Sequence, residues 1–297
     1  MTNIFQLINR YVLVIMLTFF ATPVFSQNDF LALTARAAVL LDAGSGAVLY
    51  EKNPHEQIPP ASLTKLMTIH IAQRLAEIQG ASLDEPVPLP PEAWAVNQPP
   101  RSSLMFLAQG QIVSLRELFL GLAIPSGNDA AVAVALNFAP TVAQFAALMN
   151  NEASRLGLHR TFFVEPSGID ENNVTTAAEF AVFCRVYIRE HPENLRLYHT
   201  VPEFAYPKAE NVIGGLKRRP GTILQGNHIS ILAEFAGADG LKTGYIDEAG
   251  YNLAATAERE GTRFIAVILG VPADLGPRRG DRARTADAKK LLEWGYE

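Results

Sequence analysis

Cysteine and basic clusters are both scarce in this 297-residue chain. The one cysteine, Cys184, excludes an internal disulfide framework, and its helix-like apolar surroundings predict a buried thiol rather than a reactive one. The formal net charge is −5 and no Lys/Arg stripe could track phosphates, so we expect no nucleic-acid partner. No internal repeat or low-complexity segment occurs. At this length, with 48% hydrophobic and 19% charged residues, the chain is expected to be an ordinary globular protein with a substantial core.

Long apolar runs are also missing, except near the N-terminus. There Arg10 precedes the apolar residues 11–20, Pro23 interrupts the run, and Ser26 places a small residue before Gln27. This is the layout of a secretory signal peptide, and the run is short for a membrane span of about 20 residues. We therefore expect a signal peptide over residues 1–26 and export across the inner membrane to the periplasmic or cell-wall space. Retention as an uncleaved anchor is the alternative.

Strand patterns lie at the two ends of the remaining chain, residues 27–297, and helical patterns fill its middle. Residues 37–41 and 48–51 flank a glycine-rich turn, and residues 251–257 and 263–271 flank Glu260-Gly261. The capping-box pair Ser114 and Glu117 opens one of several amphipathic helices between these hairpins. The pattern predicts an α/β (α+β) domain. Its antiparallel sheet is built from both chain ends, flanked by helices, and interrupted by an all-helical insertion over roughly residues 75–235.

Three short motifs stand in order along the chain: Ser62-Leu63-Thr64-Lys65, Ser126-Gly127-Asn128 and Lys242-Thr243-Gly244. Taken singly, each also has a non-functional interpretation. The first could be a serine and a lysine at chance spacing, the second a turn or helix cap, and the third a strand end with a solvated lysine. Together and in this order they are the signature set of serine enzymes that handle penicillin or D-alanyl peptides. They predict both a reaction and a fold.

The first motif can supply a nucleophile and its base. A serine hydroxyl attacks poorly until a neighbouring base takes its proton, and Lys65 lies on the same helix face as Ser62. A lysine serves as a base only when its pKa falls, which burial and a second cation both cause. Lys242 is the candidate second cation. The start of a helix at Ser62 would also stabilise a developing oxyanion.

The other two motifs can bind a peptide substrate and relay a proton. Ser126 can pass a proton toward a leaving group, and Asn128 can hold a peptide carbonyl. Lys242 and Thr243 can receive a carboxylate, and Gly244 lets a substrate backbone approach the strand. Another Pro-Ser-Gly, residues 166–168, lacks the asparagine, and we interpret it as an ordinary turn.

With their flanking residues, the motifs resemble the low-molecular-mass penicillin-binding proteins, which are serine D-alanyl-D-alanine carboxypeptidases. The similarity covers about residues 30–297. It rests on three extended motif segments and two further segments near the C-terminus: Ala61-Ser62-Leu63-Thr64-Lys65-Leu66-Met67-Thr68, Ser126-Gly127-Asn128-Asp129-Ala130-Ala131, Asp239-Gly240-Leu241-Lys242-Thr243-Gly244-Tyr245, Ala249-Gly250-Tyr251-Asn252-Leu253 and Lys289-Lys290-Leu291-Leu292. The resemblance implies a β-lactamase/transpeptidase-like fold and no cofactor or metal.

The resemblance also implies residue roles. Ser62 would be acylated by the penultimate D-alanine of a peptidoglycan stem peptide, or by a penicillin, with Lys65 as the base. Ser126 and Lys242 would pass a proton to the departing amine, and Asn128 would line the cleft.

Two more implied roles concern substrate binding. Thr243 would meet the terminal carboxylate beside Gly244, with help from Arg284 on the last helix. The backbone N–H groups of Ser62 and Tyr245 would form the oxyanion hole.

Two departures keep alternatives open. Tyr245 stands where several carboxypeptidases have histidine, which leaves the deacylation rate open. The chain ends after the last helix, where many carboxypeptidases continue into a β-domain and a membrane-binding helix. We therefore expect no strong membrane anchor after signal cleavage. Because endopeptidases of the superfamily also tend to lack that extension, cleavage of cross-links is an alternative.

Two further alternatives are weaker. A class A β-lactamase should carry a Glu-x-x-Leu-Asn run after Ser126 and usually has Asp where this chain has Gly127; neither is found. An inactive wall-binding homologue would keep the cleft without turnover.

Overall fold

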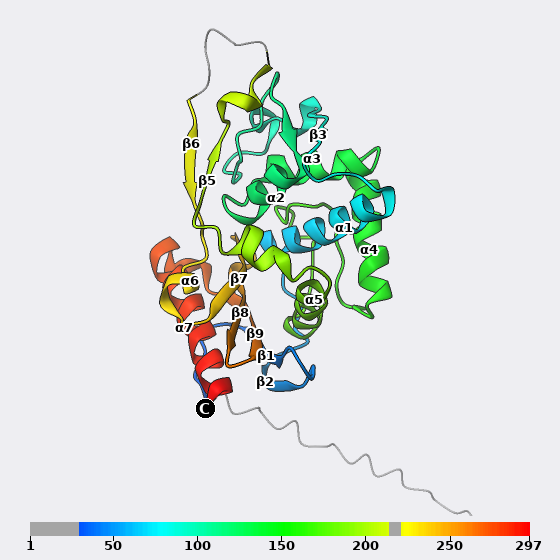
Figure 1. Cartoon of the computed structure of the whole chain (residues 1–297). Helices are drawn as coiled ribbons and strands as arrows, with labels where there is room; N and C mark the ends of the chain where they lie inside the picture. The colour runs from blue at the N-terminus through cyan, green and yellow to red at the C-terminus, as the bar shows by residue number, and fades with distance from the viewer. Residues whose placement is uncertain (1–29, 214–220) are drawn as a thin grey trace, which may run out of the picture.

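The structure, a computed structural model, describes residues 30–213 and 221–297. The predicted signal peptide, residues 1–26, lies outside the described residues. Strands from both ends of the chain form one antiparallel sheet in the order β2-β1-β9-β8-β7 (Figure 1). Its strands are β1 (Ala37–Asp42), β2 (Val48–Lys52), β7 (Ala238–Ile246), β8 (Gly250–Arg259) and β9 (Thr262–Val271). This arrangement confirms the predicted fold class.

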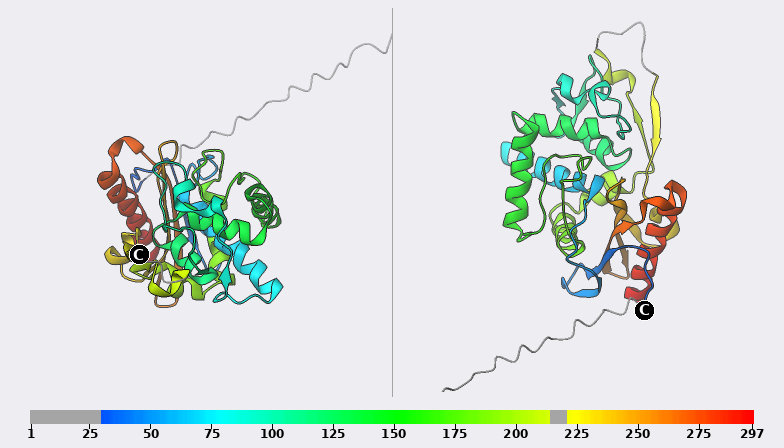
Figure 2. Two further views of the ribbon diagram at one scale, coloured as in Figure 1. Left: turned by 90° about the horizontal axis from the view of Figure 1, so that it is seen from above. Right: turned by 180° about the vertical axis from the view of Figure 1, so that it is seen from behind.

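The central strands β1, β8 and β9 are mainly apolar and mostly buried, and a hydrophobic core lies on each face of the sheet. In β1, Val39 and Leu41 face one hydrophobic core, whereas Ala38 and Leu40 face another. Helix α7 (Pro277–Tyr296) covers the second face together with the short α6 (Ile231–Glu234). Figure 2 shows these two helices on one side of the sheet and the remaining helices on the other.

The other face carries the helical part of the chain. Its helices are α1 (Thr64–Gln79), α2 (Leu115–Ala123), α3 (Asn128–Phe138), α4 (Val142–Arg155) and α5 (Ala177–Glu190). Two small hairpins accompany them, so the insertion is not all-helical as predicted: β3 (Pro86–Val87) pairs with β4 (Val113–Ser114), and β5 (Glu203–Tyr206) pairs with β6 (Ile223–Gly226). The capping box at Ser114 and Glu117 is present at the start of α2. Among the described helices, none is by itself long and apolar enough to cross a membrane; α3 and α4 reach that length only as a pair bent by 85°.

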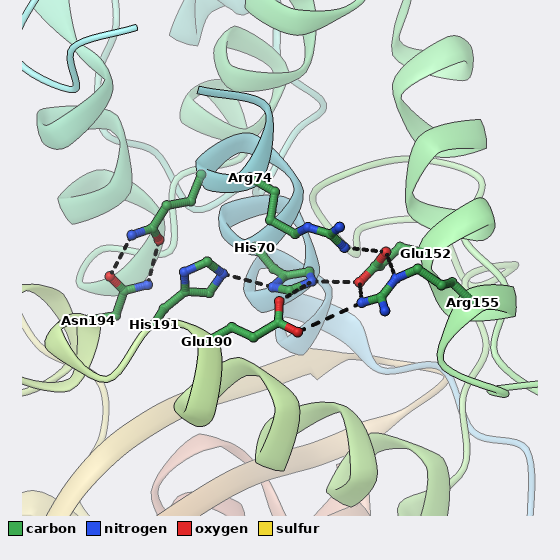
Figure 3. A network of polar contacts seen from close by, with 8 residues as sticks. His70, Arg74, Glu152, Arg155, Glu190, His191 and Asn194 are labelled. Carbon is green, nitrogen blue, oxygen red and sulfur yellow. Dashed lines mark hydrogen bonds and ion pairs between the residues drawn. The ribbon is translucent and has the colours of Figure 1, made fainter. Parts of the chain in front are cut away.

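A buried polar network ties α1 to α4 and α5 (Figure 3). The His70 ring lies 2.9 Å from Glu152 Oε1 through one nitrogen and 2.9 Å from the His191 ring through the other. Arg74 and Arg155 donate to the Glu152 carboxylate. Burial would raise the pKa of Glu152, but hydrogen bonds from Arg155 and His70 outweigh it and hold that pKa well below its usual range. The network therefore fixes the helix that carries Ser62 and Lys65 at its start.

Candidate active site

The candidate nucleophile lies where the chain turns into α1. Ala61–Leu63 form a single 3-10 turn, and α1 follows from Thr64. Ala61 has a φ of +50°, a left-handed conformation that is costly for an alanine and is held here by its surroundings. Strand β7 lies against this turn: a Cβ added at Gly244 would stand 2.8 Å from the Pro60 oxygen and 3.1 Å from the Ser62 nitrogen. The close approach explains the glycine of the third motif.

Lys65 is fully buried and contacts three groups. Its Nζ lies 3.0 Å from Ser62 Oγ, 2.8 Å from Asn128 Oδ1 and 2.6 Å from the Ser167 carbonyl oxygen. Burial lowers the pKa of Lys65 to about 7, against the opposing charges of Glu165 and Asp129. The amine is therefore substantially neutral near neutral pH.

The partners of Lys65 orient that neutral amine. A neutral amine has two N–H donors and one lone pair. The Asn128 amide oxygen and the Ser167 carbonyl can only accept, so they take the two N–H groups. The lone pair is then left for the Ser62 hydroxyl, which can donate. This is the arrangement that general-base activation of a serine requires.

The second motif forms the turn between α2 and α3. Ser126 has a φ of +61°, and its buried Oγ has no hydrogen-bond partner among the described residues. Gly127 is closely packed, since an added Cβ would lie 2.8 Å from the Met105 nitrogen. Asp129 accepts hydrogen bonds from the Met105 and Leu107 backbones. These contacts hold the turn so that Asn128 reaches Lys65.

The third motif lies on β7 as expected. Lys242 is buried, and its Nζ donates a hydrogen bond to the Thr243 carbonyl oxygen, 3.1 Å away. Burial, with the charges of Lys65 and Arg284, holds the pKa of Lys242 well below its usual range. Thr243 is buried too, so the two side chains lie below the surface rather than in bulk water.

Arg284 lies on the last helix, α7, as expected. Its guanidinium is buried and donates to the backbone oxygens of Gly244 and Asn252, each 3.1 Å away, and to Asp281. It does not line the cleft described below. Arg284 therefore supports β7 and β8 in this structure, and its contact with a substrate carboxylate stays a prediction.

A cleft of about 330 Å³ opens over these residues. Of the predicted site residues, Ser62, Asn128 and Tyr245 line it directly. Tyr245 is 41% exposed and donates from its hydroxyl to Asp247 at 2.7 Å. That hydrogen bond raises the pKa of Tyr245 to about 12, so the phenol stays neutral at neutral pH.

Sequence reasoning missed much of the cleft wall. The lining residues that no motif indicated come from two loops and from the end of β7 with the turn after it: Pro100, Arg101, Ser103, Gly168, Ile169, Ile246, Asp247 and Glu248. One signal was available, because Pro166-Ser167-Gly168 repeats the Pro-Ser-Gly of the second motif. We interpreted this segment as an ordinary turn, whereas the carbonyl oxygen of Ser167 accepts a hydrogen bond from Lys65.

A possible metal-ligand set lies elsewhere. His70, Glu190 and His191 offer three donor atoms within 4.8 Å of one another, in the network of Figure 3. Arg155 lies 3.9 Å from Glu190, and Arg74 pairs with Glu152 beside His70. A divalent cation would face both guanidinium charges, so we assign these residues to the network between helices.

Comparison with known proteins agrees with this geometry. The family model "D-alanyl-D-alanine carboxypeptidase" matches residues 23–273. The chain is 36% identical to D-alanyl-D-alanine carboxypeptidase DacC of Escherichia coli, over 88% of this chain and 61% of that protein. It thus spans about three fifths of the length of such curated relatives.

Solved structures give the same result. Penicillin-binding protein 5 from Haemophilus influenzae has a TM-score of 0.78 at 34% identity, covering 89% of this chain and 71% of that one. Penicillin-binding protein D2 from Listeria monocytogenes, solved in its ampicillin-bound form, has a TM-score of 0.74 at 30% identity, covering 90% and 99%. Since the family match includes all three motifs and most of the chain, this protein belongs to the D-alanyl-D-alanine carboxypeptidase family.

Proposed function

We propose that this protein is a serine D,D-carboxypeptidase that removes the terminal D-alanine from peptidoglycan stem peptides through an acyl-enzyme on Ser62. The observation that carries the proposal is the contact between Ser62 Oγ and the Lys65 amine, whose pKa of about 7 suits a general base. Family membership and the cleft above Ser62 support it.

Acylation begins when the neutral Lys65 amine takes the Ser62 proton. The Ser62 oxygen then attacks the carbonyl carbon of the penultimate D-alanine, and the backbone N–H groups of Ser62 and Tyr245 stabilise the oxyanion. The bond to the terminal D-alanine nitrogen breaks, and that nitrogen takes up a proton by way of Ser126 and Lys242. The Ser126 hydroxyl has no hydrogen-bond partner within the described part of the chain, which supports its use in this relay.

Hydrolysis completes the cycle. Water attacks the Ser62 ester, the shortened peptide leaves with a free carboxylate, and Ser62 regains its proton. A penicillin would acylate Ser62 in the same way when its lactam C–N bond breaks. The ampicillin-bound form of the Listeria relative supports this proposal. We also propose export to the periplasmic or cell-wall space, for which N-terminal sequencing of the secreted protein should find Gln27 first.

The proposal is tested with a fluorescent penicillin and with a pentapeptide ending in D-Ala-D-Ala. Wild-type protein should take up one label per chain and release free D-alanine, because both reactions use the Ser62 oxygen. Ser62→Ala should lose both. The matched control is Ser154→Ala on an exposed face of α4, which should keep both.

Each other outcome contradicts the proposal in a recognisable way. Absence of label and of D-alanine release from the wild type would overturn it. Rapid penicillin turnover would indicate a β-lactamase, and a stable label without peptide hydrolysis would indicate a wall-binding homologue. Faster cleavage of cross-linked peptide dimers than of pentapeptides would indicate an endopeptidase.

A further inference from the structure

The loop of residues 165–168 lies directly beneath the reacting groups, although no motif marked it as functional. Its Ser167 carbonyl accepts from Lys65 Nζ at 2.6 Å, and its Pro166 carbonyl accepts from Thr68 Oγ1 at 2.6 Å. Both donors belong to α1. At Gly168 an added Cβ would stand 1.8 Å from the Ala61 carbonyl oxygen. The loop is therefore pressed against the turn that carries Ser62.

The side chain of Glu165 holds this loop in shape. One carboxylate oxygen accepts from the Ser167 backbone N–H at 2.7 Å and from the Ser167 hydroxyl at 2.6 Å. The other accepts from the Gly168 N–H at 2.5 Å and from Asn173 Nδ2 at 3.0 Å. Four donors thus converge on one carboxylate, and charge-assisted hydrogen bonds of this kind are the stronger ones. The direction of the Ser167 carbonyl depends on them.

That direction matters for the base. The neutral Lys65 amine presents its lone pair to Ser62 only while both acceptor-only partners are in place. Asn128 is held by α3, whereas the Ser167 carbonyl is held by the loop and hence by Glu165. If the loop relaxed, one N–H could turn toward Ser62 in place of the lone pair.

We propose that Glu165 is a positioning residue for acylation, whose carboxylate fixes loop 165–168 so that the Ser167 carbonyl aims the Lys65 amine at Ser62. This role rests on the proposed use of Lys65 as the base. Glu165 acts through the loop and need not touch the substrate.

The charge of Glu165 has a second effect. Three charged groups face Lys65: Glu165 from the loop, Asp129 from α3 and Lys242 from β7. The two carboxylates raise the pKa of Lys65, Glu165 more than Asp129, and so oppose the lowering by burial. Removing the Glu165 charge should therefore lower the pKa of Lys65 and extend its neutral form to lower pH.

The test compares wild type with Glu165→Gln, Glu165→Asp and the matched control Glu171→Gln, which removes an exposed carboxylate six residues away. Stopped-flow acylation by a fluorescent penicillin is followed between pH 5 and 9. The Lys65 amine is titrated separately by NMR of ¹³Cε-labelled lysine, with its signal assigned through Lys65→Met.

For Glu165→Gln we expect the acylation rate at the plateau of the pH–rate profile to fall at least tenfold, since an amide cannot accept from all four donors. The rising part of that profile should also move to lower pH. Its Lys65 signal should titrate at lower pH as well. Glu165→Asp keeps the charge, so the rising part of its pH–rate profile should stay near that of the wild type. Its shorter side chain should lower only the plateau rate. Glu171→Gln should match wild type throughout.

A wild-type plateau rate in Glu165→Gln, or an unchanged Lys65 titration in that variant, would overturn the proposal. If Glu165→Gln does not fold, Glu165→Asp decides, because its shorter side chain keeps the charge but cannot reach all four donors. A lowered plateau rate with wild-type titration of Lys65 supports positioning, and a wild-type plateau rate or a displaced titration contradicts it. The NMR titration does not require turnover. A wild type that neither acylates nor releases D-alanine would therefore refute the proposed function and leave the Lys65 titration to judge Glu165 separately.

Discussion

At the scale of single residues, Lys65 shows how function and stability oppose each other. A buried amine is useful as a base because burial lowers its pKa, and the same burial makes the folded state hold its proton weakly. In the unfolded chain the same lysine titrates near the ordinary lysine pKa of 10.5. Between about pH 7 and 10.5 the unfolded state therefore binds a proton that the folded state lacks, and the free energy of unfolding rises with pH.

Lys65→Met should consequently raise the stability of the protein while abolishing acylation. The methionine fills similar space without the desolvation cost. After the loss of three hydrogen bonds, we expect a net gain of roughly 1–3 kcal/mol in the free energy of unfolding at pH 7.5. The measurement is urea unfolding at pH 7.5 and 9.5, where the gain should shrink at the higher pH. A variant less stable than wild type at pH 7.5 would show that Lys65 contributes more through its contacts than burial costs.

At the scale of elements, the start of α1 is shaped by the loop packed against it. Gly168 adopts a φ of +84° and lies too near the Ala61 carbonyl for any side chain. Gly157 has a similar φ of +75° with open space around its Cα, so it offers a control with the same backbone cost and no clash.

Gly168→Ala should displace the loop and so misplace the Ser167 carbonyl beside Lys65. We expect acylation by penicillin to slow at least tenfold. Gly157→Ala should acylate at the wild-type rate and lose about 1 kcal/mol of stability, from the positive φ alone. Stopped-flow labelling and urea unfolding of both variants check this. Equal acylation rates in the two variants would mean that the loop does not position the base.

The network between α1, α4 and α5 makes a prediction about acid stability. Burial lowers the pKa of His191 to about 4, whereas in the unfolded chain it titrates near 6.5. As the pH falls from 6.5 to 4, the unfolded state gains a proton that the folded state does not, so stability is lost over that window.

His191→Gln should weaken this pH dependence, since glutamine cannot titrate. The exposed His159 provides the control, and His159→Gln should leave the dependence unchanged. Thermal unfolding of the three proteins at pH 4.5, 5.5 and 7 measures the effect. An identical fall in Tm for wild type and His191→Gln would exclude His191 as the source.

At the scale of the whole molecule, the sheet and the three motifs were predictable from the sequence because their signals are local. Apolar runs on either side of glycine-containing turns predicted both hairpins, and the i, i+3 spacing predicted the contact of Ser62 with Lys65. The position of loop 165–168 was not predictable, since its contact with Lys65 joins residues 102 positions apart. Nor were the intramolecular partners of Arg284, which are carbonyls of β7 and β8 and the Asp281 carboxylate.

The fold brings the three motifs together through contacts between separate elements. The start of α1 meets β7 at Gly244, the turn before α3 meets Lys65 at Asn128, and the cleft opens above all three. Strand β7 ends the order of the described strands, so an extended peptide could pair along it with its scissile carbonyl over Ser62. The proposed function requires one covalent intermediate, on Ser62.

The position of the acyl group is the most direct measurement of that intermediate. The protein is mixed with the D-Ala-D-Ala pentapeptide or with benzylpenicillin, quenched in acid, digested and analysed by mass spectrometry. We predict that both reagents leave their adduct on the peptide that contains Ser62, and that Ser62→Ala carries neither. An adduct on any other residue, or D-alanine release that persists in Ser62→Ala, would contradict the account.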